Sequence, residues 1–133
     1  THIKQITGLD LDKEISVYIT HPSLRNGRYF GNGTLAWGHA EDWDNYTVVY
    51  LWHELLHSYL GYSNIDHAIV ELLTDDDLRS FLNNEEYPPM IGHDHLKGLK
   101  KELLPKWREY LKSDKKDILG WVASLHKEED LTK

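Results

Sequence analysis

One stretch of the sequence constrains the fold more than any other, because it can only form a long helix. Residues 45–60, NYTVVYLWHELLHSYL, contain neither glycine nor proline, and they stand between Asp44, a suitable N-cap, and Gly61, a suitable C-cap. Apolar residues occur nearly all round this helix, which is the pattern of a helix buried inside a domain. We therefore expect the rest of the chain to pack around residues 45–60.

The residues before this helix have the pattern of strands. Residues 14–21 alternate apolar and polar side chains with a period of two, as a half-buried strand does. Residues 28–40 contain Asn32-Gly33, and an Asn-Gly pair between two β-prone segments is a strong signal for a hairpin. Residues 22–27 have turn-forming composition. The N-terminal third therefore predicts a small antiparallel sheet.

The residues after the helix predict a mostly helical remainder. In chain order we expect a helix from Ser63 or Asn64 through Leu82, a loop at 83–89, a helix at 95–112 with a break at Pro105, a helix at 117–126, and a loose charged tail at 126–133. The chain shows no internal repeat and no linker. We expect a single α+β domain over residues 1–133.

Composition and charge exclude several classes of protein. The chain of 133 residues has no cysteine, which excludes disulfide scaffolds, thiolate metal sites and cysteine nucleophiles. Its 22 acidic and 15 basic residues give a net charge of −7, and such a surface repels the phosphates of nucleic acids. No apolar run approaches the roughly 20 residues that span a bilayer. Nine histidines are many for this length, and they point to a metal site.

The predicted buried helix carries an H-E-x-x-H motif, His53-Glu54-Leu55-Leu56-His57. Residues four apart lie on one face of a helix, so the two imidazoles can bind one zinc ion. Glu54 is rotated by about 100° from His53, where it can reach a water molecule on the ion without being a ligand. The alternative is that these residues only pair with one another. We favour the metal, because three polar groups on a buried helix need a strong common partner.

Zinc needs a third protein ligand and an open position for water. The next predicted helix offers Glu71, with Asp75 four residues later on the same face. Glu71 can supply a carboxylate oxygen, and Asp75 can accept the outer N–H of a ligating histidine. His67 lies on the same face and is the rival third ligand. Residues 75–77 could instead form a solvated acidic turn.

H-E-x-x-H followed in the next helix by E-x-x-[small]-D resembles the gluzincin metallopeptidases, and the chain is similar in size to the compact minigluzincins. The match covers residues 50–76. The resemblance implies a zinc-dependent endopeptidase with His53, His57 and Glu71 as metal ligands, Glu54 as general base and Asp75 orienting a histidine. Leu60 and Ser63 stand where the metzincin pattern needs glycine and histidine, so that family is excluded.

The resemblance also implies how a substrate is held. In such peptidases a strand before the catalytic helix pairs with the substrate backbone, and the predicted strand here is Leu35, Ala36 and Trp37. A further donor usually stabilises the tetrahedral intermediate. The candidates are His93 and His95, followed by Tyr46, Tyr62 and Tyr87.

We therefore predict a hydrolase with one catalytic Zn²⁺ ion that cleaves proteins or peptides. Two alternatives stay open: a latent or catalytically silent zinc-binding domain used for protein interaction or regulation, and a small-molecule hydrolase on the same scaffold. We expect no nucleic-acid partner and no membrane segment in this chain, and we leave the oligomeric state open. No signal peptide is recognisable, which favours the cytoplasm.

Overall fold

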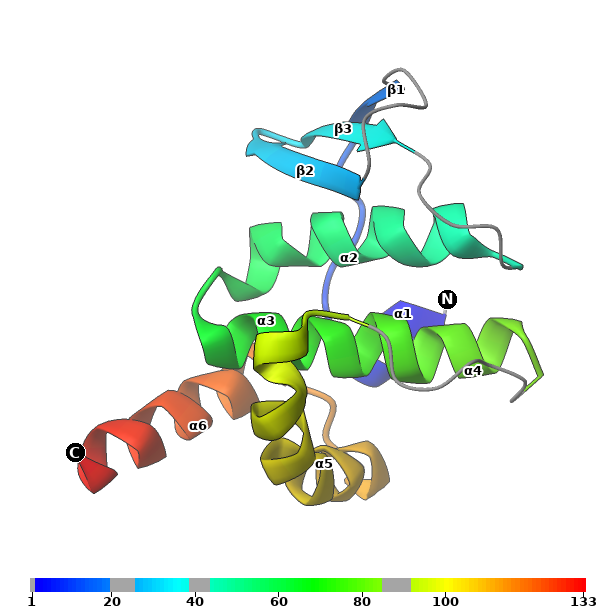
Figure 1. The fold of residues 1–133 in the computed structure, drawn as a ribbon. Coiled ribbons are helices and arrows are strands. Elements are labelled where there is room, and N and C mark those ends of the chain that lie inside the picture. Colours follow the sequence, from blue (N-terminus) through cyan, green and yellow to red (C-terminus); the bar gives the residue numbers. More distant parts are fainter. Residues whose placement is uncertain (1, 20–25, 39–43, 85–91) are drawn as a thin grey trace.

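The computed structural model describes residues 2–19, 26–38, 44–84 and 92–133. It has the α+β architecture that the sequence predicts, with a three-stranded sheet on one side of a helical body. Helix α2 (Tyr46–Leu60) lies between the sheet and the helix that follows it in the chain (Figure 1). The helix that was predicted to be buried is thus central in the molecule.

The sheet is mixed, and not antiparallel as predicted. Strands β1 (Ser16–Ile19), β2 (Asn26–Gly31) and β3 (Thr34–Gly38) occur in the order β1-β3-β2. The predicted hairpin is present between β2 and β3, where Asn32 and Gly33 both have the positive φ that a tight hairpin turn requires. The hairpin folds back so that β3 lies beside β1 and runs parallel to it.

The central position of β3 corrects a prediction about the site. Residues 35–37 pair with residues 17–19 of β1 on one side and with β2 on the other. A strand whose backbone is paired on both sides has no free edge to offer a substrate. The prediction that Leu35, Ala36 and Trp37 form the substrate-binding strand is therefore wrong. Among the described strands, β1 and β2 are the edges.

The turn after α2 is built as predicted. Gly61 ends the helix with a φ of 103°, a conformation that favours glycine, and its N–H bonds the carbonyl of His57. Helix α3 (Asn64–Glu71) begins with a capping box, in which Ser63 and Asp66 each accept the other's backbone N–H. At the other end of α2 the N-cap is Asn45 and not Asp44, because asparagine tolerates the left-handed conformation found there.

The helix that starts with α3 changes its winding in the middle. It passes into η1 (Leu72–Leu78), a π-helix, and then into α4 (Arg79–Leu82), so the predicted run to Leu82 is confirmed. A π-helix bonds residue i to residue i+5, and such turns occur frequently at functional sites. Because η1 turns less per residue than an α-helix, it changes the direction in which the following side chains point.

The C-terminal part is a pair of helices, α5 (Lys97–Lys112) after the short 3₁₀-helix η2 (Asp94–Leu96), and α6 (Ile118–Thr132). Contrary to the prediction, α5 does not break at Pro105. Pro105 and Lys101 are exposed, so water can bond the carbonyl that the proline leaves free. The predicted loose tail at 126–133 is also wrong, since α6 runs to Thr132 and His126 bonds Asp66 at 2.7 Å.

The core lies among α2, α3, η1, α5 and α6. It is made of aliphatic and aromatic side chains that include Val49, Leu56, Ile69, Leu73, Trp107 and Ile118. A short N-terminal helix, α1 (His2–Thr7), adds Ile3 to this core; it was not predicted from the sequence. The expected turn at 22–27, the loop at 83–89 and Tyr87 lie largely or wholly outside the described residues.

In the part of the chain that the structure describes, no helix combines the length and the apolar character needed to cross a bilayer.

Candidate metal centre

Helix α2 positions the two histidines of the motif side by side in the interior. Their spacing of four residues puts His53 and His57 on the face of α2 that packs on α3, and their side chains are almost wholly buried, with 4% and 6% of each residue exposed. The ring centroids lie 5.1 Å apart. This is the arrangement that the motif predicts for two ligands of one ion.

The outer nitrogen of His57 is held by the turn that follows the helix. His57 Nδ1 lies 2.8 Å from the carbonyl oxygen of Gly61. A carbonyl oxygen only accepts, so Nδ1 must carry the hydrogen and Nε2 keeps its lone pair. Burial lowers the pKa of His57, which favours this neutral form. The positive φ of Gly61 is therefore part of the site, because it aims the carbonyl at the ring.

The outer nitrogen of His53 is held by η1. His53 Nδ1 lies 3.4 Å from Oδ1 of Asp75, a carboxylate that is 1% exposed, so the predicted contact between Asp75 and a motif histidine is present. Burial alone would lower the pKa of His53, but the hydrogen bond and charge of Asp75 outweigh it and raise that pKa. A more basic imidazole is a stronger metal ligand.

His67, the rival third ligand, reaches the same place from α3. Its Nε2 lies 3.2 Å from Nε2 of His53, and its ring centroid lies 4.6 Å from that of His57. Two nitrogen ligands of one tetrahedral zinc ion lie about 3.3 Å apart, given zinc–nitrogen distances of about 2.0–2.1 Å. Burial and the neighbouring imidazoles lower the pKa of His67 to about 3, so the ring is neutral at pH 7.

Glu71 pairs with His93 and Lys100, and its Oε1 lies 3.8 Å from Nε2 of His67. The side chain is fully buried, and its Oε1 accepts from the backbone N–H of His93 at 2.9 Å and from Nδ1 of His93 at 2.7 Å. Its Oε2 lies 3.3 Å from Nζ of Lys100. Lys100 is also fully buried, and the same Nζ lies 3.3 Å from Oδ2 of Asp76. Gly92 permits this approach, because a Cβ there would collide with Glu71.

Two overlapping groups of side chains could thus hold a metal ion. In each group the ligand atoms all lie within 4.8 Å of one another. We call His53, His57 and His67 the inner group, and His67, Glu71 and His93 the outer group. Within the described residues, the predicted set of His53, His57 and Glu71 does not form such a group.

Glu54 lies beside the inner group on the side of the sheet. It is half-buried, and burial raises its pKa, although His53 and the backbone N–H of Tyr29 in β2 act in the opposite direction. A raised pKa suits a carboxylate that must take up a proton near neutral pH. Glu54 therefore interacts with both His53 and β2, and its role as a general base stays a prediction.

The residues predicted to stabilise the tetrahedral intermediate differ in how close they lie to the two groups. His93 belongs to the outer group, whereas His95 is exposed, has its ring centroid 5.6 Å from that of His93 and belongs to neither group of described residues. Tyr62 stacks on the ring of His57 at 5.1 Å and an interplanar angle of 7°. Tyr46 is buried, with its ring centroid 6.4 Å from that of Trp37 in β3.

The run of aspartates at 75–77 is not a solvated turn. Asp75 faces His53, Asp76 faces Lys100, and Asp77 accepts from Nε2 of His2 at 3.0 Å. Each carboxylate therefore pairs with a base from a different helix. The alternative that these residues form a solvated acidic turn is excluded for Asp75, which is 1% exposed.

Sequence reasoning missed Lys100, although a signal for it existed. Lys100 occupies a position in the apolar stripe of α5, between Leu96 and Leu103, where a lysine is out of place unless a buried acid receives it. The π-helix η1 was missed as well, and nothing in residues 72–78 indicates it.

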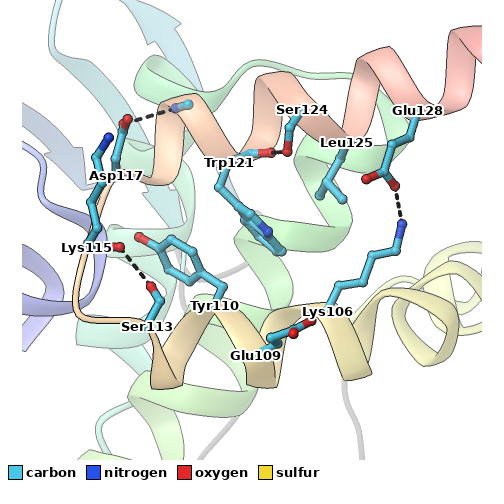
Figure 2. Close-up of a pocket in the computed structure, with 11 residues that line it drawn as sticks. Lys106, Glu109, Tyr110, Ser113, Lys115, Asp117, Trp121, Ser124, Leu125 and Glu128 are labelled. Carbon is cyan, nitrogen blue, oxygen red and sulfur yellow. Dashed lines mark hydrogen bonds and ion pairs between the residues drawn. The ribbon is translucent and has the colours of Figure 1, made fainter.

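A pocket between α5 and α6, with a volume of about 650 Å³, lies apart from both groups and contains none of their residues. Tyr110 and Trp121 stack on each other in its wall (Figure 2). Several of its polar side chains are engaged within the helices or the segment between them: Lys106 with Glu128, Ser113 with the carbonyl of Lys115, and Ser124 with that of Trp121. The described residues that line the pocket form no catalytic set.

Comparisons with protein-family models, with curated proteins and with solved structures gave no match for this chain.

Proposed function

We propose that this chain is a zinc-dependent hydrolase that cleaves peptide bonds, with the inner group as its metal site and Glu54 as its general base. The observation that carries the proposal is the convergence of three imidazoles, two of which have their donor capacity already used. His53 and His57 each give their outer nitrogen to a fixed acceptor, so that both turn a lone pair toward His67. Imidazoles held in this way are typical of zinc ligands.

The third ligand in this proposal is His67 and not Glu71. The resemblance to gluzincins assigns that place to Glu71, but Glu71 is engaged with His93 and Lys100, whereas Nε2 of His67 already lies at a ligand–ligand distance from His53. Three neutral nitrogen donors leave a fourth tetrahedral position free, as catalytic zinc sites do.

Bound zinc would act as a Lewis acid and lower the pKa of a water molecule toward about 7. The chain supplies the proton acceptor, since the carboxylate of Glu54 follows the first ligand on α2 and its raised pKa suits it to hold that proton and pass it to a leaving amine. The carbonyl of Gly61 and the carboxylate of Asp75 hold His57 and His53 in the tautomer that binds a metal through Nε2.

The sheet favours a peptide over other substrates. β2 is an edge strand that packs on α2, and the backbone N–H of Tyr29 in β2 interacts with Glu54. An extended peptide added to this edge would place its backbone beside the general base, and main-chain pairing of this kind tolerates many sequences. The substrate strand in this proposal is therefore β2 and not β3.

The test is hydrolysis of an unstructured protein such as casein by the zinc-loaded chain. We expect Glu54→Gln to lower the rate by roughly 10²–10⁴-fold, the usual contribution of a general base, and to leave the zinc content at one ion per chain. Glu109→Gln, an exposed substitution of the same type on α5, is the control and should match wild type.

Full activity in Glu54→Gln would exclude the proposed mechanism. A wild-type chain that binds one zinc ion and cleaves nothing would leave the catalytically silent zinc-binding domain as the surviving alternative.

A further inference from the structure

The inner and outer groups differ in their access to solvent. His53 and His57 are 4% and 6% exposed, so an ion from water reaches them less readily than it reaches more exposed side chains. The outer group reaches the surface through two of its members, because the side chain of His93 is 54% exposed and that of His67 is 22% exposed. An ion that arrives from solvent therefore meets the outer group first.

The two groups share a ligand, and this links them. Nε2 of His67 lies 3.2 Å from Nε2 of His53 and 3.8 Å from Oε1 of Glu71. One lone pair cannot bind two ions, so the groups exclude each other, and at most one is occupied at a time. An ion held by His67 could, however, exchange Glu71 and His93 for His53 and His57 without ever leaving the protein.

The charges around the two groups set the direction of this exchange. In the outer group Oε2 of Glu71 already faces the ammonium of Lys100 at 3.3 Å, which repels a cation, and His93 Nδ1 hydrogen-bonds the carboxylate that an ion would need. In the inner group Asp75 makes His53 a better donor, and the outer nitrogen of each motif histidine is bound elsewhere. The outer group is therefore the weaker site.

We propose that the outer group is a loading site, which captures a divalent cation of the zinc type at the surface and passes it to the inner group through the shared ligand His67. This inference rests on the proposed zinc centre. It assigns to His93 and Glu71 a role in the rate of metal uptake and release, and not in the final affinity.

The experiment measures metal exchange on the full chain and uses no enzyme activity. Metal-free protein is mixed with Co²⁺ in a stopped-flow instrument, and uptake is followed by absorbance. Release is followed by transfer of zinc from the loaded protein to an excess of a chromophoric chelator. His93→Ala is the test variant, and its side chain is exposed enough for the fold to tolerate the change. His95→Ala removes an exposed neighbouring histidine and is the matched control.

We expect His93→Ala to slow uptake and release alike, by roughly tenfold, the lower end of the rate gain that a site gathering ions near a binding centre gives. A loading route changes both rates equally, so the equilibrium Kd should stay within about a factor of three of the wild-type value, and His95→Ala should match wild type throughout.

Rates in His93→Ala that equal those of wild type would overturn the loading site and leave the zinc centre standing. Slower uptake without slower release would also overturn it, since His93 would then be a ligand of the final site. Failure of the wild-type chain to bind Zn²⁺ or Co²⁺ at all would overturn the zinc centre itself.

Discussion

Two buried carboxylates lie four residues apart on the same continuous helix, and they face opposite neighbours. Asp75 faces α2 and holds the outer nitrogen of His53, whereas Glu71 faces α5 and holds His93 and Lys100. The first is paired with an imidazole, which turns its other nitrogen into a better ligand. The second is paired with an ammonium, which satisfies its charge and opposes its binding of a cation. The partner of a buried acid therefore decides whether it supports a metal site or competes with one.

The largest effect should be the loss of stability when the cation that pairs with Glu71 is removed. Lys100→Met leaves a buried carboxylate without its cation, and such a loss destabilises a fold by about 3–5 kcal/mol. Unfolding in urea measures the change. Lys101→Met, an exposed neighbour, is the control and should lie within about 0.5 kcal/mol of wild type.

A double variant sharpens this prediction. Lys100→Met combined with Glu71→Gln removes both charges of the pair, so most of the lost stability should return, as a double-mutant cycle would show. If Lys100→Met is as stable as Lys101→Met, the pair between Lys100 and Glu71 has no structural importance.

The next effect separates the two candidates for the third ligand. His67→Ala should weaken zinc binding by more than about 100-fold, beyond the range for residues that only support a ligand, whereas Glu71→Gln should change the Kd by less than about tenfold. Competition with a chelator of known affinity measures both. The reverse order would restore Glu71 as the ligand, as the resemblance to gluzincins implies.

A smaller loss of zinc affinity is expected when the charge of Asp75 is removed. Asp75→Asn keeps the shape but removes the charge that orients His53, and changes of this kind lower metal affinity by about 10–100-fold. The same titration measures it. Asp77→Asn is the matched control, because Asp77 pairs with His2 and not with either group. Equal affinities in the two variants would mean that Asp75 does not tune the site.

The smallest effect is the dependence of zinc affinity on pH. The pKa of His53 is raised, so the metal-free fold keeps this proton to a higher pH than the unfolded chain does. The proton therefore stabilises the metal-free fold fully below about pH 6.5, and this contribution is lost as the pH rises through the raised pKa.

Zinc must displace that proton, so binding should weaken as the pH falls. The pKa values of His57 and His67 are lowered, and their rings are already deprotonated near neutral pH. The logarithm of Kd should therefore change by about one unit per pH unit just below the pKa of His53. An affinity that does not change with pH would contradict this assignment.

The parts of the site that follow from local rules could be predicted from the sequence. The spacing of His53 and His57 requires only a helix, and the absence of glycine and proline in residues 45–60 predicts that helix. Gly61 and Ser63 are end signals with a direct backbone cause. The contact of Asp75 with His53 also agrees with the prediction.

The parts that depend on packing between distant segments could not be predicted. The parallel pairing of β1 with β3 is decided by how the hairpin folds back, which no local pattern encodes. The prediction for Glu71 assumed α-helical spacing to Asp75, but η1 intervenes and the two carboxylates diverge. Lys100 belongs to a helix that follows Glu71 by some thirty residues in the chain. The only indication of its role in the sequence is its position within an apolar stripe.

The π-helix η1 has a further consequence for how this chain can change. A π-turn is what a helix becomes when it holds one residue more than its regular winding can accommodate. Deleting a single residue of this segment would let ordinary α-helical winding cover nearly the same total rotation, because each residue of a π-helix turns less than a residue of an α-helix. Arg79, which is fully buried, would then keep its place in the interior. The same deletion inside the regular helix α5 would instead rotate everything beyond it by about 100°. The chain can therefore lose a residue in η1 with less disturbance of the packing beyond it than in α5.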